Sequence, residues 1–272
     1  PSAISAISVP SAISAISVIS AISAISVPSA ISVPSAISAI SVISAISAIS
    51  VPSAISVPSA ISAPLSTAIF PACYFPPVSW FAAAIRESGF LLIEAQRPYR
   101  KQQLSSRAHI RVPNRVMPLT VPVVRRNAHA PLCDKHIAYA ENWPHQHWQS
   151  LRAGYANSPY FEFFAPEIKA LLDDPPEKLL TLLLRSTQMA MDWLQMDLPL
   201  QLTAQHLPPE AYARDYRAAF DPSRRHLPGW FGNEPYEQVF GAYDADLSIL
   251  DLLCNLGPES RAYLLRNGVG LA

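Results

Sequence analysis

Basic side chains crowd the interval that follows Glu94, and few acidic residues offset them. An arginine guanidinium binds phosphate through two parallel hydrogen bonds, and a lysine adds a compact positive charge. The interval therefore predicts a phosphate-bearing small molecule as the partner. The alternative is a solvated hairpin face that binds nothing. The basic residues are Arg97, Arg100, Lys101, Arg107, Arg111, Arg115, Arg125 and Arg126.

Glu94 closes a short apolar run, residues 90–93, and is a candidate general base. A carboxylate partly shielded from water at the end of a strand could take a proton from a sugar hydroxyl or an amine. In open α/β sheets, ligands bind beyond the carboxyl ends of strands, which is where Tyr74 and Glu94 would lie. The alternative is an ordinary strand-end carboxylate paired with an arginine.

Two histidines, His145 and His147, flank Gln146 at the start of a predicted helix. An HxH pair can bind a metal ion on a strand, where both rings point to one face, but the rings diverge on a helix. No cysteine or acidic residue stands at ligand spacing, so we predict no metal site. A histidine at a helix start can still donate to an anion or relay a proton.

Asp251 and Asn255 are four residues apart on a predicted helix, so their side chains share one face. They are candidates for ligand contact, and a structural hydrogen bond is the alternative. Ser158 lacks the GxSxG context that exposes a nucleophile, so we do not propose covalent catalysis through it. The chain contains neither GxGxxG nor a Walker A sequence, which argues against a dinucleotide or P-loop site. The residues identify no cofactor.

The elements that must position these side chains follow from hydrophobic spacing. Residues 67–75, 78–88 and 90–93 are predicted as strand, helix and strand, a βαβ unit. Residues 109–124 alternate around Pro113-Asn114 and predict a hairpin. Helices are predicted at 143–155, 177–196, 247–253 and in a last segment ending at Arg266. The sequence therefore predicts a single α/β domain with a βαβ start, a β-hairpin and a helical C-terminal half, preceded by a low-complexity disordered tract.

That tract is a triplet repeat with serine at every third position from Ser2 to Ser62. A period of three fits neither a strand nor an α-helix, so no apolar face forms, although it fits polyproline II. We assign residues 1–64 to the repeat and residues 65–272 to the functional domain. One hypothesis is that the repeat is a translated tandem DNA repeat joined upstream of the true start, which sequencing of the messenger's 5′ end would test.

Charge and cysteine usage narrow the classes of protein. The 20 basic and 20 acidic residues cancel, which removes the main argument for a dedicated nucleic-acid binder. No apolar run is long enough to span a bilayer, and no signal-peptide pattern is present. The three cysteines are widely spaced without a CxxC pair, which suits a reducing compartment. We therefore expect a cytoplasmic protein without a transmembrane segment.

Four blocks of the chain, in order, resemble the WbqC-like family of bacterial proteins. The first contains Tyr-Phe-Pro-Pro followed by an aromatic pair, and the second contains Lys101 and Arg107. The third contains His147 and Trp148, and the fourth contains Asp251 and Asn255. The blocks lie at residues 72–81, 94–123, 143–162 and 236–258. The repeat has no counterpart in the family.

The resemblance implies a transferase associated with O-antigen and other surface polysaccharides, including transfer of an aminoacyl (glycine) group to a sugar. It favours Lys101 and Arg107 as phosphate-binding residues, His147 as a proton carrier, and Tyr74 as the residue that positions the acceptor. Trp148, Asp251 and Asn255 join them as substrate-binding candidates. One departure is the segment from Leu104 to Ser106, where the family usually has an aromatic residue and an Arg-Asn-Arg run, which predicts a weakened anion-binding turn.

Three functions remain open at this point. The first is a transferase that uses a nucleotide-activated or lipid-linked sugar. The second is a nucleotidyltransferase or adenylate-forming enzyme, since a proline turn, a helix and a basic segment could also cradle a triphosphate. The third is a non-catalytic module that binds an activated sugar or a partner through the aromatic residues between Trp143 and Tyr160.

Overall fold

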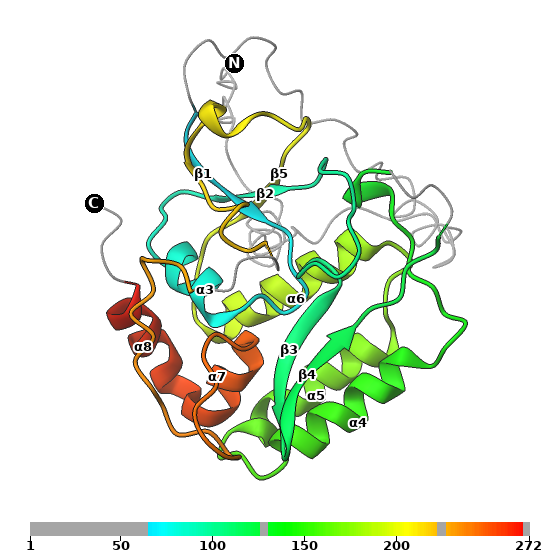
Figure 1. Cartoon of the computed structure of the whole chain (residues 1–272), viewed down its shortest axis with the longest axis vertical. Coiled ribbons are helices and arrows are strands. Elements are labelled where there is room, and N and C mark those ends of the chain that lie inside the picture. Colours follow the sequence, from blue (N-terminus) through cyan, green and yellow to red (C-terminus); the bar gives the residue numbers. More distant parts are fainter. Residues whose placement is uncertain (1–64, 126–129, 222–226, 269–272) are drawn as a thin grey trace, which may run out of the picture. The chain divides into compact units, whose positions relative to one another are not determined.

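A computed structural model describes residues 65–125, 130–221 and 227–268 (Figure 1). The triplet repeat and Arg126 lie outside these ranges, so the predictions made for them stay predictions. The described residues form an α/β fold with a four-stranded sheet and a separate two-stranded sheet. Within these ranges no helix has the length and apolar character needed to cross a membrane.

The four-stranded sheet has the order β5-β2-β1-β6, and its neighbouring strands are parallel. A parallel pair needs a crossover connection, which helix α3 supplies between β1 and β2. Every residue of α3 is buried. The predicted βαβ start is confirmed. The elements are β1 (Leu65–Pro71), α3 (Val78–Ala84), β2 (Leu91–Glu94), β5 (Leu200–Leu202) and β6 (Tyr212–Asp215).

Strand β1 ends at Pro71, before the predicted end at Phe75. The chain has left the sheet there, because the Tyr74 N–H donates to the Leu104 carbonyl at 2.8 Å and Phe75 has a φ of 39°. Helix α3 also ends earlier than predicted. The N–H groups of Arg86 and Glu87 bond to carbonyls three residues back, which tightens the chain into turns.

The hairpin consists of β3 (Arg107–Val112) and β4 (Arg115–Thr120), which pair antiparallel around the predicted Pro113-Asn114 turn. The predicted hairpin is confirmed, with a start at Arg107 and an end at Thr120. Residues beyond Thr120 leave β3 because they pair elsewhere: Val123 forms a bridge with Ile137, and the Val124 N–H donates to the His136 carbonyl.

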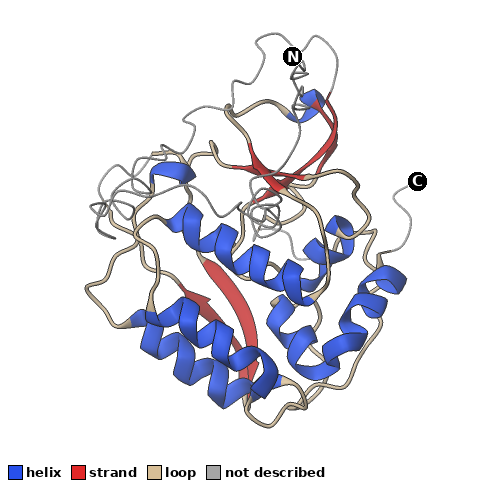
Figure 2. Ribbon diagram, turned by 180° about the vertical axis from the view of Figure 1, so that it is seen from behind, coloured by secondary structure: helices blue, strands red, loops and turns tan. Residues whose placement is uncertain are grey.

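The C-terminal half is helical, as predicted. Helix α4 (Trp143–Tyr155) spans the predicted residues, and α5 (Phe161–Asp173) follows in a segment where no helix was predicted. Figure 2 shows the two helices side by side, and α4 is the one that packs on the hairpin strands. Helix α6 (Leu179–Trp193) crosses between the two sheets (Figures 1 and 2). Eight of its residues are buried, and all of them are apolar or carry a hydroxyl group. The chain continues in α7 (Ile249–Leu256) and α8 (Ser260–Asn267).

Candidate functional site

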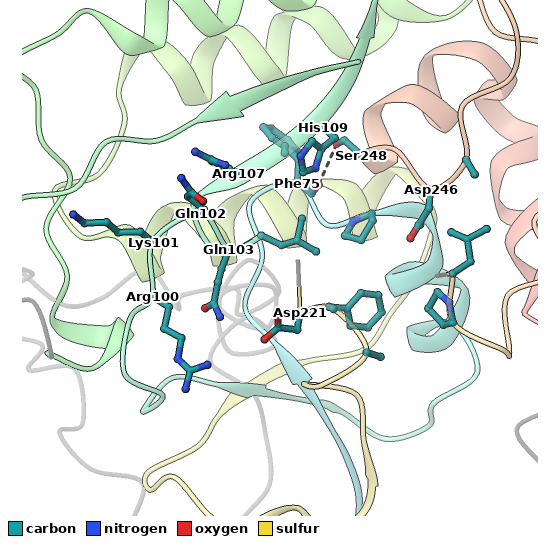
Figure 3. Close-up of a pocket in the computed structure, with 18 residues that line it drawn as sticks. Phe75, Arg100, Lys101, Gln102, Gln103, Arg107, His109, Asp221, Asp246 and Ser248 are labelled. Carbon is teal, nitrogen blue, oxygen red and sulfur yellow. Dashed lines mark hydrogen bonds between the residues drawn. The ribbon is translucent and has the colours of Figure 1, made fainter. Parts of the chain in front are cut away.

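A cavity of about 840 Å³ opens beyond the carboxyl ends of β1, β2 and β6, and we name it the main pocket (Figure 3). Ligands of open α/β sheets bind at this edge, because the loops that leave the strands converge there. Segments that follow β1, β2 and β6 line it together with β3 and the segment before α7. Its polar lining side chains are Arg100, Lys101, Gln102, Gln103, Arg107, His109, Asp221, Asp246 and Ser248.

Backbone hydrogen bonds join three distant segments into one wall of the main pocket. The Ser248 N–H donates to the His109 carbonyl at 2.8 Å, and the Ser248 hydroxyl donates to the Phe75 carbonyl at 3.1 Å (Figure 3). The Val78 N–H donates to the Leu247 carbonyl at 3.0 Å. The loop after β1, strand β3 and the start of α7 are therefore held in a fixed relation at the pocket.

Backbone strain also gathers at the main pocket. Three of its lining residues, Phe75, Gln102 and Asp246, have positive φ angles of 39°, 64° and 54°. A bulky side chain rarely adopts such a conformation, and residues held in it concentrate at functional sites. The Phe75 conformation is held from both sides, because its N–H donates to the Ser186 hydroxyl at 3.3 Å and its carbonyl accepts from Ser248.

Along one side of the main pocket, Arg100, Lys101 and Arg107 carry positive charge that no acidic side chain neutralises within the described parts of the chain. The buried Nε of Arg107 also lacks a hydrogen-bond partner there. Arginines elsewhere differ: Arg214 pairs with Glu87 at 2.8 Å, and Arg217 pairs with Glu94 at 2.6 Å. This side of the pocket therefore has the character of an anion site.

Asp246 lies on the other side of the main pocket, as Figure 3 shows. Its two carboxylate oxygens accept from the Ser79 N–H and the Ser79 hydroxyl, both at 2.7 Å. Although part of the residue is exposed, burial of the carboxyl raises the pKa of Asp246 to about 6, against the effect of these two hydrogen bonds. A carboxyl with a pKa near neutrality can exchange a proton with a bound ligand.

His109 contributes a second titratable side chain to the main pocket. Burial lowers its pKa, and the positive charge of Arg107 lowers the pKa further. The imidazole is therefore neutral at pH 7 and can accept a proton. Arg107 and His109 are two residues apart on β3, so they share one face of the strand. The alternation of Arg107, His109 and Arg111 is the signal in the sequence that could have identified His109, and it was not used.

Glu94 ends β2 as predicted, but it does not line the main pocket. It is 1% exposed, and its Oε2 accepts from Arg217 Nη1 at 2.6 Å and lies 3.0 Å from His206 Nδ1. The Thr203 hydroxyl donates to Oε1 at 3.2 Å. The structure thus places Glu94 in a buried ion pair, the alternative weighed for it from the sequence.

The chain is similar to known proteins over much of its length. A family model described as the WbqC-like protein family matches residues 72–218, which is more than half of the chain. The chain belongs to the WbqC-like family. The match includes the first three blocks of the resemblance and ends before the fourth, at residues 236–258. It also covers the basic side of the main pocket and His109.

A curated relative is the uncharacterized protein Rv1507c of Mycobacterium tuberculosis. The two proteins are 24% identical over 224 residues, which cover 72% of this chain and 96% of the relative. No solved structure matches the chain. The comparisons therefore assign the family without assigning a reaction.

Tyr74 and His147, which lie in the first and third blocks of the family resemblance, form a buried pair and do not line the main pocket. The Tyr74 hydroxyl lies 3.2 Å from His147 Nδ1, and His147 Nε2 lies 3.2 Å from the Thr120 carbonyl. Burial lowers the pKa of His147 to about 4 and raises that of Tyr74. A neutral histidine with Nε2–H directed at Thr120 satisfies all three groups, so this contact ties α4 to the loop after β1 and to the end of β4.

The remaining predicted site residues also lie outside the main pocket. Trp148 packs against Phe161 and borders a groove near α4 and α5. Asp251 is fully buried in α7 and accepts hydrogen bonds from Tyr236 at 2.6 Å and Gln238 at 2.8 Å. The Asn255 side chain donates to the Asp251 carbonyl at 2.8 Å, the structural bond weighed as the alternative.

Of the predicted site residues, the structure brings only Lys101 and Arg107 to the main pocket. Sequence reasoning missed His109, Asp246 and Ser248, which complete it. Asp246 and Ser248 precede α7 and carried no spacing signal, because they reach the site only through the folding of the chain. Among the described residues no group of three histidine, cysteine, aspartate or glutamate side chains is placed to hold a metal ion.

Proposed function

We propose that this chain is a transferase of bacterial surface-polysaccharide (O-antigen) assembly that binds a nucleotide-activated or lipid-linked sugar in the main pocket. The observation that carries the proposal is a group of three cations, Arg100, Lys101 and Arg107, at the carboxyl edge of a parallel sheet, none of which has an ion pair among the described residues. Family membership and the association of the resemblance with such gene clusters support the reaction class. The free cysteines suit the cytoplasm as its location.

The two sides of the main pocket would divide the chemistry. On the basic side, Lys101 and Arg107 would hold the phosphate and stabilise the negative charge that develops on it as it leaves. His109, beside Arg107 on β3, or Asp246 on the other side would take the proton from an acceptor hydroxyl or amine as that group attacks. Glu94 would support the site indirectly by anchoring Arg217 and His206.

The test of ligand class is a thermal-shift screen with nucleotides, nucleotide sugars and aminoacyl donors, followed by turnover assays with each stabilising compound. Stabilisation by a sugar nucleotide with turnover supports the transferase. Consumption of a nucleoside triphosphate with Mg²⁺ would instead indicate the nucleotidyltransferase alternative. The absence of a shift with any phosphate-bearing compound would contradict the proposal.

The site itself is tested by removing its charges. We expect Lys101→Gln and Arg107→Gln each to weaken binding of the stabilising nucleotide by about tenfold, because each variant removes a charge-assisted hydrogen bond. Isothermal titration calorimetry measures the change. Arg115→Gln is the matched control, since Arg115 is an exposed arginine of the same hairpin that lines neither side of the main pocket. Equal affinity in all four proteins would contradict the phosphate site.

A groove on the helical side favours a binding-module alternative. It encloses about 830 Å³ and includes the rings of Tyr139 and Trp148 together with Asn142, His145 and Asp173. Tyr139 is 47% exposed, and its hydroxyl donates to the Pro176 carbonyl at 2.7 Å, so the ring is held as a platform. Ligand-induced stabilisation that Trp148→Ala abolishes, in the absence of any turnover, would favour this module over the transferase.

A further inference from the structure

A second basic cavity adjoins the main pocket, and we name it the side pocket. It encloses about 460 Å³ between the turn that follows β2 and the segment that follows β4. Lys101, Gln102 and Arg107 line both cavities. The two pockets therefore adjoin at these three residues, which form the wall between them.

The side pocket is positively charged. Lys101, Arg107, Arg125 and Lys135 line it, and none of its lining residues is an aspartate or glutamate. Lys135 is 3% exposed, with its Nζ 5.3 Å from the centre of the Tyr99 ring. Arg125 has no ion pair within the described ranges. A cation at the wall of a hollow that lacks acidic groups provides a favourable field for an anion.

The positive charge that lines the main pocket and the side pocket together exceeds the negative charge of one phosphate. Arg100, Lys101, Arg107 and Arg125 are four cations without ion pairs in the part of the chain that the structure describes. A phosphate monoester carries about −1.5 to −2 at neutral pH. A second, covalently linked phosphate would supply the missing charge, and it needs contacts on both sides of the shared residues.

We infer that the two pockets together bind one diphosphate. One phosphate would contact Arg100 in the main pocket, the other would contact Arg125 in the side pocket, and Lys101 and Arg107 would lie between them. This inference rests on the proposed phosphate site and deepens it, because it requires the activated sugar to carry two linked phosphates that contact both pockets.

The experiment compares three probes, orthophosphate, methylenediphosphonate and inorganic pyrophosphate, by isothermal titration calorimetry with the full chain. We expect the two diphosphate probes to bind at least about tenfold more tightly than orthophosphate, because additional charge-assisted hydrogen bonds form. Arg125→Gln should remove most of this preference and leave orthophosphate affinity within about twofold. Arg115→Gln, the exposed arginine on the same hairpin, should leave both affinities unchanged.

The outcomes separate this inference from the proposed function. If orthophosphate binds and Lys101→Gln weakens it, but diphosphates gain nothing, the phosphate site stands and the diphosphate inference is overturned. An unchanged diphosphate preference in Arg125→Gln would overturn it as well. If none of the three probes binds, both proposals fail.

Two further probes identify the source of the diphosphate. Uridine diphosphate represents a nucleotide-activated sugar, and geranyl diphosphate represents a lipid-linked sugar. Tighter binding of either probe than of inorganic pyrophosphate, lost in Arg125→Gln, supports the inference and shows which group the pockets accept. Weaker binding of both than of orthophosphate would overturn it, since the pockets would then exclude substituted diphosphates.

Discussion

At the scale of single residues, burial shifts the pKa of three ionisable side chains, and their hydrogen-bond partners differ. Asp246 and His109 line the main pocket, and burial favours the uncharged form of each. It raises the pKa of Asp246 and lowers the pKa of His109. His147 is also buried, but both of its ring nitrogens already have partners in the core. Burial shifts the pKa of all three side chains, and the hydrogen bonds of His147 to Tyr74 and Thr120 make that residue a structural contact.

His147 should make folding stability depend on pH. Its pKa is about 4 in the folded state and 6.5 in the reference state, so below pH 6.5 the unfolded chain binds a proton that the folded chain excludes. The contribution of neutral His147 to the free energy of unfolding is therefore fully present above pH 6.5. It is lost as the pH falls toward 4, and the total loss is about 3 kcal/mol.

Denaturant unfolding of the wild type and His147→Gln between pH 4 and pH 8 measures this contribution. The difference in unfolding free energy between the two proteins should change with pH, and His145→Gln, at an exposed position of the same helix, is the control for removing a histidine from α4. A constant difference between the wild type and His147→Gln would show that the buried histidine does not resist protonation.

At the scale of elements, close packing of helix α4 on the hairpin sets the position of β3 and so of its pocket side chains. Gly154 of α4 lies against the backbone of β3, where a Cβ atom would come within 2.4 Å of the Arg111 carbonyl oxygen. Arg107 and His109 belong to this strand, so its place relative to the parallel sheet determines how they reach the main pocket.

We expect Gly154→Ala to destabilise the protein by about 1–3 kcal/mol, because overpacking against a backbone outweighs the gain in helix propensity. Chemical denaturation measures the change in the free energy of unfolding. Gly229→Ala is the control, since nothing lies within 4 Å of a Cβ at Gly229 and no positive φ is required there. If Gly154→Ala is as stable as the wild type, the close approach of Gly154 to the Arg111 carbonyl is contradicted.

At the scale of the whole molecule, a buried ion pair joins the carboxyl ends of two strands separated by a long stretch of chain. Arg217, just after β6, pairs with Glu94 at the end of β2, and it also pairs with Asp215 at 2.7 Å. Both Arg217 and Glu94 are buried. The network holds together the sheet edge from which the loops of the main pocket emerge.

Removing Arg217 should leave the Glu94 charge buried without its cation. We expect Arg217→Gln to lower the free energy of unfolding by about 3–5 kcal/mol, as for other buried pairs that lose one partner. Arg214→Gln, which breaks the more exposed pair with Glu87, should cost no more than about 1 kcal/mol. Equal effects of the two substitutions in urea unfolding would argue against the buried network.

The sequence by itself determined the elements whose signals are local. Hydrophobic spacing predicted the βαβ start, the Pro113-Asn114 hairpin and helix α4, because periodicity and turn residues act over a few neighbouring positions. The short basic segment supplied the candidate cations, and the family resemblance selected Lys101 and Arg107 among them. Helix α5 was missed, and its interior Pro166 is a residue that ordinarily ends helices.

Only the tertiary structure decided which candidates meet. Glu94 and His147 were both candidate proton carriers in the sequence, but long-range contacts with Arg217 and Tyr74 place them away from the main pocket. Asp246 reaches it from far along the chain because Ser79 of α3 binds its carboxylate. Contacts between segments far apart in sequence leave no periodic pattern, so the partner of a buried charge is read only from the folded chain.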